Sequence, residues 1–255
     1  MTVTREPHVI ESERVPLQPV PGTDSTYRVV IDRENSSCQN LVQRVFYYAP
    51  GTSPKMKNTD SEDVVFIVSG AGEAIVDGKA HALTERMGLL IPPGASYHFH
   101  NPGPETLELV SVLAPQPGDP GSLDASPEAR PVDGKLTVHE DEEEPIQAGI
   151  ERYFKLMIDP RYGCKYVTQF VGYIDMVNPE VHLHTYEEVI YILSGEGIAH
   201  IGEQDIPIQR GSCIYLPPGT WHCVENPYEG TVLRLLGVFC PAGSPGAYTP
   251  KDPQG

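Results

Sequence analysis

Short runs of β-branched and aromatic residues recur along this chain, and turn signals separate them. Val64–Val68 and Glu188–Leu193 are two such runs, and the turns between runs read Ser-Gly or Pro-Pro-Gly. Runs of this length bounded by glycine and proline predict strands, and no stretch shows a helical period of any length. We therefore expect an all-β fold of short antiparallel strands, with 24 glycines and 26 prolines available for the turns.

The strand pattern occurs twice. Ser69-Gly70 returns as Ser194-Gly195, and the Pro-Pro-Gly of residues 92–94 returns at residues 217–219, in both cases 125 residues later. Upstream, Cys38-x4-Gln43 matches Cys164-x4-Gln169 at an offset of 126. A shared offset over several blocks indicates a duplicated domain.

Polar and proline-rich stretches divide the chain around this repeat. We expect an irregular arm over residues 1–25, a first domain over 26–113, a linker over 114–145, a second domain over 146–241 and a tail over 242–255. The linker ends in an acidic run at residues 140–144, which we expect to be solvated. A closed sheet in each domain would have few free edges and a hollow interior that can hold a small ligand.

The charge balance restricts the partners. Asp and Glu number 35 against 18 Lys and Arg, a net charge of −17, so nucleic acid and an anionic membrane surface are not expected partners. No apolar signal segment or membrane span is apparent, and the five cysteines lack a C-x-x-C spacing and suit reduced thiols. We expect a soluble, cytoplasmic protein.

The second copy carries a cluster of potential metal ligands. His182 and His184 are two residues apart, so on a strand both imidazoles face the same way. Glu188 begins the next apolar run, and His222 follows the Pro-Pro-Gly turn. If the barrel closes, all four side chains can converge inside it, where three imidazoles and a carboxylate suit one divalent transition metal such as Mn, Fe, Ni, Co, Cu or Zn.

Other residues near this cluster leave alternatives open. Glu187 competes with Glu188 as the carboxylate ligand. Gln169 and Tyr186 flank the expected site, where each could support a ligand or touch substrate, although packing inside the barrel is the commoner role for such residues.

These residues resemble the cupin superfamily. His182-x-His184-x3-Glu188-x6-Gly195 is similar to the first cupin motif, and Gly211-x5-Pro217-x-Gly219-x2-His222-x3-Asn226 to the second. The first motif departs from the family pattern at its opening glycine, where Met176 stands. The resemblance covers residues 42–239 and implies a bicupin, which has two tandem double-stranded β-helix (jelly-roll) barrels, with metal ligands His182, His184, Glu188 and His222; its spacing favours Glu188 over Glu187.

The first copy lacks this ligand set. At the offset of 125, Lys57, Thr59, Asp63 and Tyr97 take the four ligand positions, so we expect no metal there. His98 and His100 should point to the opposite face from Tyr97. The first copy could instead pack against the second or hold an anion through Lys57 or Tyr97.

We expect an enzyme that uses one metal ion on a small, oxygen-chelating organic substrate. The resemblance is compatible with dioxygenases, decarboxylases and other lyases, isomerases and hydrolases; a dioxygenase-type oxidoreductase is our first choice. No further carboxylate inside the barrel presents itself as a general acid, which disfavours decarboxylation. The alternatives are a cupin isomerase, lyase or hydrolase, and a bicupin that binds a small molecule without catalysis. Two chains could pair as a homodimer, although the duplication can satisfy such pairing within one chain.

Overall fold

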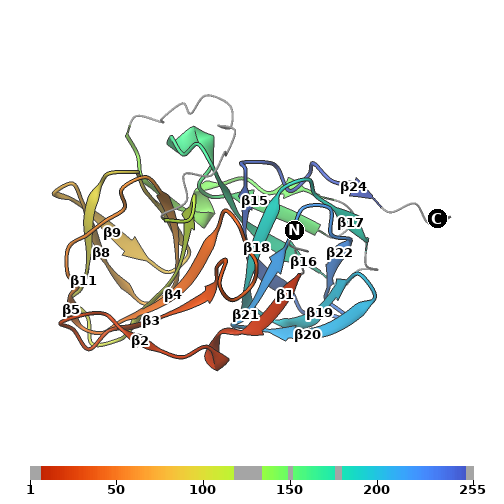
Figure 1. The fold of residues 1–255 in the computed structure, drawn as a ribbon, viewed down its shortest axis with the longest axis horizontal. Helices are drawn as coiled ribbons and strands as arrows, with labels where there is room; N and C mark the ends of the chain where they lie inside the picture. The colour runs from red at the N-terminus through yellow and green to blue at the C-terminus, as the bar shows by residue number, and fades with distance from the viewer. Residues whose placement is uncertain (1–6, 118–133, 149–151, 176–179, 251–255) are drawn as a thin grey trace.

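The computed structural model describes residues 7–117, 134–148, 152–175 and 180–250. Its strands form two barrels that lie side by side, one built mainly from the first half of the chain and the other from the second (Figure 1). Each barrel consists of one seven-stranded and one five-stranded antiparallel sheet. The expectation of an all-β fold with two jelly-roll barrels is confirmed.

The N-terminal barrel contains two sheets. Its large sheet runs in the order β13 (Thr137–His139), β10 (Met87–Ile91), β7 (Glu62–Ser69), β12 (Leu107–Ala114), β4 (Val42–Tyr48), β3 (Thr26–Ile31) and β2 (Gln18–Pro19). Its small sheet contains β5 (Gly51–Thr52), β11 (Ser96–Asn101), β8 (Ala71–Val76) and β9 (Lys79–Thr84), and β6 (Met56–Lys57) also pairs with β11.

The C-terminal barrel repeats this plan. Its large sheet runs in the order β1 (His8–Glu11), β21 (Ser212–Leu216), β18 (Glu187–Ser194), β23 (Leu233–Cys240), β16 (Thr168–Ile174), β15 (Arg152–Leu156) and β14 (Ile146–Gln147). Its small sheet runs β20 (Gln204–Gln209), β19 (Glu196–Ile201), β22 (His222–Glu225), β17 (His182–Leu183) and β24 (Thr249–Pro250). Three short 3-10 turns complete the described elements: η1 (Ser12–Arg14), η2 (Glu140–Glu142) and η3 (Pro160–Tyr162).

The two large sheets share one apolar core between the barrels. Side chains from both halves meet in it, for example Val45 and Val112 with Val171 and Val238. Each barrel also has an interior core of its own, formed by the residues that alternate with these along the strands. The large sheets are therefore buried on both faces, which explains why their strands read as continuous apolar runs.

Each barrel receives a strand from the segment that leads into the other. Strand β1 precedes the N-terminal barrel but pairs with β21 of the C-terminal one, with His8 opposite Tyr215 (Figure 1). Strand β13 precedes the C-terminal barrel but pairs with β10 of the N-terminal one. The expectation of an irregular arm is wrong for the described residues 8–11 and 18–19, because their backbone groups complete sheet edges.

The acidic run is also more structured than expected. Glu140 is fully buried and forms ion pairs with Arg86 of the N-terminal barrel (3.1 Å) and Arg234 of the C-terminal barrel (2.7 Å). Two guanidinium groups compensate the buried carboxylate, so this part of the linker connects both barrels and is not a solvated spacer.

Two equivalent glutamates fasten the barrels to each other. Glu62 on β7 accepts hydrogen bonds from the backbone N–H groups of Lys165, Tyr166 and Val167. Glu187 on β18 accepts from the backbone N–H groups of residues 39 and 40. The two glutamates are 125 residues apart, so this pair of interface contacts follows the same repeat as the sequence.

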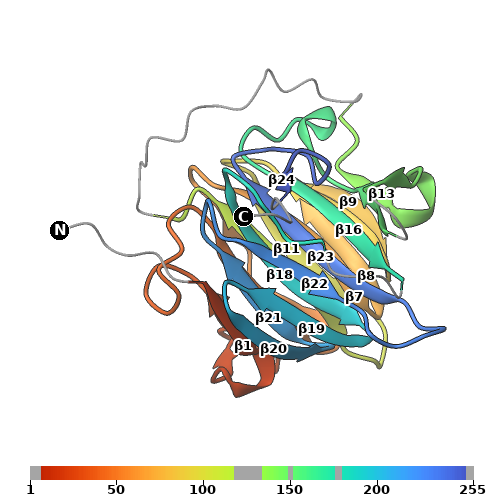
Figure 2. The same ribbon diagram turned by 90° about the vertical axis from the view of Figure 1, so that its right-hand side faces the viewer.

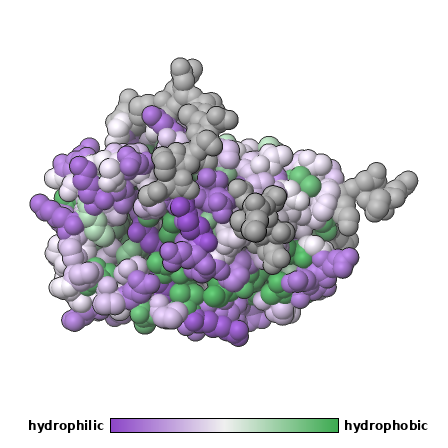
Figure 3. Space-filling view, viewed as in Figure 1, coloured by the Kyte–Doolittle hydropathy of each residue, from purple (hydrophilic) through white to green (hydrophobic). Residues whose placement is uncertain are grey.

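The surface offers few large apolar side chains. On the face in Figure 3, apolar residues form an interrupted band among polar ones. All five cysteines are buried and free, as expected for reduced thiols. In the described part of the chain, we find no helix long and apolar enough to cross a membrane.

Candidate metal centre

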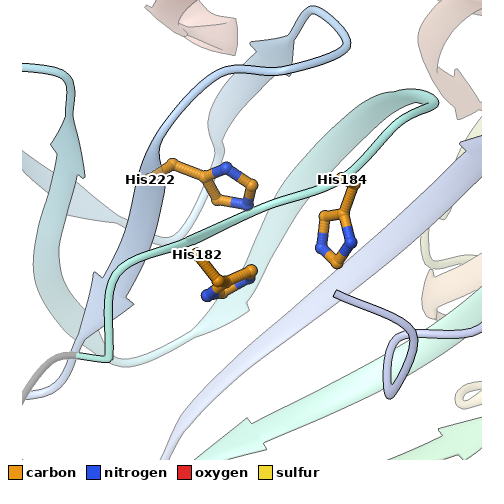
Figure 4. A group of neighbouring side chains, drawn as sticks. All are labelled: His182, His184 and His222. Atoms are coloured by element: carbon orange, nitrogen blue, oxygen red, sulfur yellow. The ribbon is translucent and has the colours of Figure 1, made fainter. Parts of the chain in front are cut away.

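Three imidazoles meet inside the C-terminal barrel. His182 lies on β17, His184 directly follows that strand, and His222 begins β22. His182 and His222 face each other across the antiparallel pair β17–β22, and the three rings lie around one point (Figure 4). One nitrogen from each ring lies within 4.8 Å of the other two. Nitrogens bound to one ion at about 2.0–2.1 Å are roughly 3–4 Å apart, so this cluster is close to a ligand arrangement.

The Pro-Pro-Gly turn connects the two motifs. Gly219 has a φ of +79°, a left-handed conformation that favours glycine, and its N–H donates a hydrogen bond to the backbone carbonyl of His184 at 2.8 Å. The turn thereby fixes the backbone at His184 and delivers His222 at the start of β22. The spacing of the second motif thus has a direct structural reason.

Backbone carbonyls set the tautomer of all three imidazoles. Nδ1 of His182 lies 2.9 Å from the carbonyl oxygen of Glu180, Nδ1 of His184 3.3 Å from that of Ala247, and Nδ1 of His222 2.9 Å from that of Thr220. A carbonyl can only accept, so each Nδ1 carries the proton. Nε2 of each ring then has a free lone pair, which is the form that ligates a metal.

The surroundings also keep these rings neutral. Burial, helped by the neighbouring His222, lowers the pKa of His182 to about 4, and burial lowers the pKa of His184. Since a metal binds only the neutral imidazole, the folded chain presents these two ligands without a proton to displace at neutral pH.

Glu188 provides the test of whether a cation fits. Its Oε2 is buried without a hydrogen-bond partner among the described residues. It lies 3.6 Å from Nε2 of His222 and 3.8 Å from Nε2 of His184, too far for hydrogen bonds. An unsatisfied buried carboxylate oxygen is costly, and a cation between it and the imidazoles would satisfy it. The four residues fit a divalent metal.

Alternation along β18 decides between the two glutamates. Glu188 shares its face with Ile190 and Ile192, which belong to the interior core of the barrel. Glu187 shares its face with Val189 and Tyr191 of the core between the barrels, and it bonds residues of the other barrel. Glu188 is therefore the carboxylate at the site.

The histidines line a cavity of about 100 Å³ that is partly open to solvent. The C-terminal barrel, which contains this cavity, faces the viewer in Figure 2. Apolar side chains form most of the wall, among them Phe154, Ile174, Ile190, Leu235 and Phe239. A cavity of this size holds an organic molecule of a few non-hydrogen atoms.

The C-terminal segment closes one side of the site. The hydroxyl of Tyr186 donates to the carbonyls of Ser244 (2.8 Å) and Ala247 (3.1 Å), while β24 pairs with β17. The Tyr186 ring also stacks on His184, with centroids 4.9 Å apart. We call residues 243–250 the C-terminal strap. The segment that we expected to be a polar tail therefore holds the His184 ring in position through its described residues. Tyr186 contacts His184, which agrees with one of the two roles expected for it.

Gln169 does not belong to the site. It shares a face of β16 with Val171 and Tyr173 of the core between the barrels. Its side-chain oxygen lies 3.1 Å from where a Cβ on Gly88 of the other barrel would stand. The prediction that Gln169 flanks the metal centre is wrong, because the side chain points out of the barrel and into the interface.

The cavity wall also includes polar residues that the sequence did not single out, among them Arg152, Glu180 and Tyr248. Arg152 shares a face of β15 with Phe154, a signal that could have placed it inside. Glu180 and Tyr248 lie in segments without a strand periodicity, so the sequence pattern does not place them near each other. In the fold, the Tyr248 hydroxyl lies 3.4 Å from Glu180 Oε1. A carboxylate does line the cavity, contrary to expectation. Met176 lies outside the described residues.

The corresponding place in the N-terminal barrel is occupied by an ion pair. Asp63, at the position of Glu188, accepts hydrogen bonds from Arg44 (2.8 Å) and Ser111 (2.7 Å). Tyr97 is buried and donates to Asn58, whereas Lys57 and Thr59 are exposed. His98 and His100 alternate with buried Tyr97 and Phe99, as expected. A guanidinium group thus neutralises the carboxylate that remains from the ligand set.

A family model described as the cupin domain matches residues 44–113 and 176–239, together more than half of the chain. The chain belongs to the cupin family. It contains two cupin domains, and this bicupin is similar to several characterised proteins. An oxalate-binding protein of Thermotoga maritima is 39% identical over 62 residues, which are 23% of this chain and 50% of that protein. A dimethylsulfoniopropionate lyase of Ruegeria pomeroyi is 29% identical over 113 residues, 42% of this chain and 72% of the lyase. The bicupin thus spans about half the length of the first of these relatives.

Solved structures share its fold. Protein YlbA from E. coli superimposes with a TM-score of 0.74 at 15% identity, covering 92% of this bicupin and 91% of that chain. A mutant of Bacillus subtilis oxalate decarboxylase gives a TM-score of 0.72 at 15% identity, covering 92% and 78%. At this identity the likeness concerns the fold alone.

Proposed function

We propose that His182, His184, Glu188 and His222 bind one divalent transition metal, and that this bicupin is a metal-dependent enzyme for a small organic substrate with oxygen donors. The observation that carries the proposal is the buried, unpaired Oε2 of Glu188, 3.6 and 3.8 Å from two imidazole nitrogens. Ligand type does not select among Mn, Fe, Ni, Co, Cu and Zn, because imidazole and carboxylate suit all of them.

A bound metal would supply Lewis acidity toward substrate oxygens. The chain's own groups do the rest. The apolar walls lower the local polarity and so strengthen electrostatic interactions inside the cavity. The carbonyls of residues 180, 220 and 247 hold the imidazoles in position. Glu180, exposed at the cavity, can hold or release a proton at Oε1.

Metal binding is tested with His184→Ala and the control His98→Ala. The protein is stripped with a chelator, reloaded with Co²⁺ and analysed for bound metal. His184→Ala should lose most of the metal, while His98→Ala, which lies on the outer face of the N-terminal barrel, should retain it. Full metal retention by His184→Ala would overturn the ligand assignment.

For the reaction, a dioxygenase-type oxidation is our first proposal. The largely apolar wall of the cavity beside the ligand cluster supports it, because an apolar site admits dioxygen, itself an apolar molecule. Substrate turnover in air and under nitrogen tests it: removal of dioxygen should abolish turnover. Turnover that continues without dioxygen excludes this reaction.

A lyase reaction is the second candidate, and Glu180 favours it. Lyases need a group that transfers a proton, and Glu180 is a carboxylate in the cavity wall. The Ruegeria pomeroyi relative is named as a lyase. If this candidate holds, Glu180→Gln should lower kcat by about 100-fold or more with metal content unchanged, and turnover should not require dioxygen.

Binding without catalysis remains the alternative from a different class, since one relative is named as an oxalate-binding protein. The polar groups Arg152, Glu180 and Tyr248 in the cavity favour catalysis over simple storage. A metal-loaded protein that binds its ligand and releases it unchanged under both atmospheres would establish the binding function.

A further inference from the structure

One charged side chain in the cavity wall has no role in the metal centre. Arg152 is the first residue of β15. Because side chains alternate along a strand, Arg152 and Phe154 face the barrel interior and Tyr153 faces the other way. It lines the same cavity of about 100 Å³ as His182, His184, Glu188 and His222. The cavity therefore has a cationic group in addition to the proposed metal ligands.

Arg152 is poorly satisfied by the protein. Its Nη2 donates to the carbonyl of Val224 at 3.1 Å. Its Nε is buried and has no hydrogen-bond partner among the described residues, and none of the ion pairs found there involves Arg152. A guanidinium group has five donors, so most of its capacity is left for another partner.

This situation differs from that of two other half-buried arginines. Arg44 and Arg234 each pair with a buried carboxylate, Asp63 and Glu140 respectively. Arg152 instead lies among apolar walls, where burial lowers its pKa despite acidic side chains nearby. A half-buried cation with no ion-pair partner among the described residues favours an anionic ligand, and a planar carboxylate matches the guanidinium fork.

We propose that Arg152 binds the carboxylate group of the substrate. The substrate would then be a small carboxylate with a second oxygen-bearing group, which lies toward the cluster of His182, His184, Glu188 and His222. The volume of about 100 Å³ accommodates a molecule of a few carbon atoms. Only the placement of the second oxygen-bearing group near the metal ligands rests on the proposed function. The contact between Arg152 and the substrate carboxylate needs no metal.

The test uses three substitutions and three probe compounds. Oxalate, glycolate and malonate are titrated calorimetrically into the parent protein, Arg152→Met, Arg152→Lys and the control Arg210→Met. Arg210 is exposed and, outside the cavity, pairs with Glu108 of the other barrel. Every titration is made with the Co²⁺-loaded and with the metal-free protein, and metal content is determined separately.

Arg152→Met should weaken binding of at least one probe by about tenfold or more, because a charge-assisted hydrogen bond is lost. Arg152→Lys should show an intermediate loss, since it keeps the charge but not the fork. Metal content should be unchanged in all variants, and Arg210→Met should bind like the parent. The melting temperature of ligand-free Arg152→Met should equal or exceed that of the parent, because an uncompensated cation has been removed.

The outcomes separate the two proposals. Binding of the probes by Arg152→Met within twofold of the parent would overturn the assignment, as would a parent protein that binds none of them in either form. A parent that takes up no metal, but whose oxalate binding depends on Arg152, would overturn the metal-dependent function and support the role of Arg152.

Discussion

At the scale of single residues, the ion pair of Arg44 and Asp63 lies in the N-terminal barrel where the C-terminal barrel has its proposed carboxylate ligand. The Asp63 side chain is 2% exposed and that of Arg44 16%, and Ser111 bonds both. The position equivalent to Arg44 at the offset of 126 is Phe170, whose ring packs against Phe239 in the C-terminal barrel. One barrel thus places a guanidinium group where the other places a ring.

Arg44→Met should destabilise the protein by about 3–5 kcal/mol, because it leaves the Asp63 carboxylate buried without its counter-ion. Urea unfolding measures the loss. The double variant Arg44→Met/Asp63→Leu should recover most of it, and the surface control Arg210→Met should cost less than about 1 kcal/mol. An Arg44→Met variant as stable as Arg210→Met would contradict the ion-pair interpretation.

His200 should give a pH dependence of stability. Its Nδ1 lies 2.6 Å from Asp205 and its Nε2 2.7 Å from Glu225. Burial alone would lower its pKa, but the hydrogen bonds to these carboxylates outweigh burial and raise it above 6.5. The folded state therefore holds the proton more tightly than the unfolded state. This stabilisation is fully present below pH 6.5 and is lost as pH rises through the raised pKa.

The measurement compares the parent with His200→Gln by urea unfolding at pH 5.5 and pH 9. The parent should be more stable than the variant at pH 5.5, by up to about 1 kcal/mol, and the difference should shrink at pH 9. A difference that is constant across this range would show that His200 does not change its protonation between these states.

At the scale of elements, the C-terminal strap gives the next prediction. A chain that ends at Pro241 loses the carbonyl that holds Nδ1 of His184 and both acceptors of the Tyr186 hydroxyl. Loss of such a supporting contact typically lowers metal affinity by about 10–100-fold. We expect this loss in a Co²⁺ titration, with little change in the melting temperature.

The matched control is a chain shortened only by residues 251–255. It keeps the strap and should bind Co²⁺ like the full chain. Equal affinities of the full chain and the chain ending at Pro241 would show that the strap does not orient His184.

Elements also show where sequence reasoning succeeds and where it stops. The cupin spacing selects Glu188 over Glu187, and the two side chains do lie on opposite faces of β18. Alternation correctly separates Tyr97 from His98, because both lie on one regular strand. It fails for Gln169, because β16 is buried on both faces, so polarity does not mark which face looks into the barrel. Glu180 and Tyr248 lie beside the cavity only through tertiary contacts between segments that carry no period.

At the scale of the whole molecule, the barrels should unfold together. They share an apolar core, exchange β1 and β13, and are fastened by Glu62 and Glu187. Scanning calorimetry should show one transition with equal calorimetric and van't Hoff enthalpies. Glu62→Ala, which leaves three backbone N–H groups without their acceptor, should lower the temperature of that single transition and not split it. Two resolved transitions in the parent protein would contradict this.

The exchanged strands have a further consequence for how the two sites could become unequal. In a dimer of identical chains, any substitution changes both subunits at once, so a lost ligand set is lost twice. Here both barrels belong to one polypeptide, and β1 and β13 hold each against the other whatever side chains fill their interiors. The N-terminal barrel can therefore have an Arg44–Asp63 ion pair at the ligand position, while the C-terminal barrel has three imidazoles. Covalent linkage thus lets the two barrels differ: one barrel is free to take a supporting role, and the other holds the proposed metal ligands.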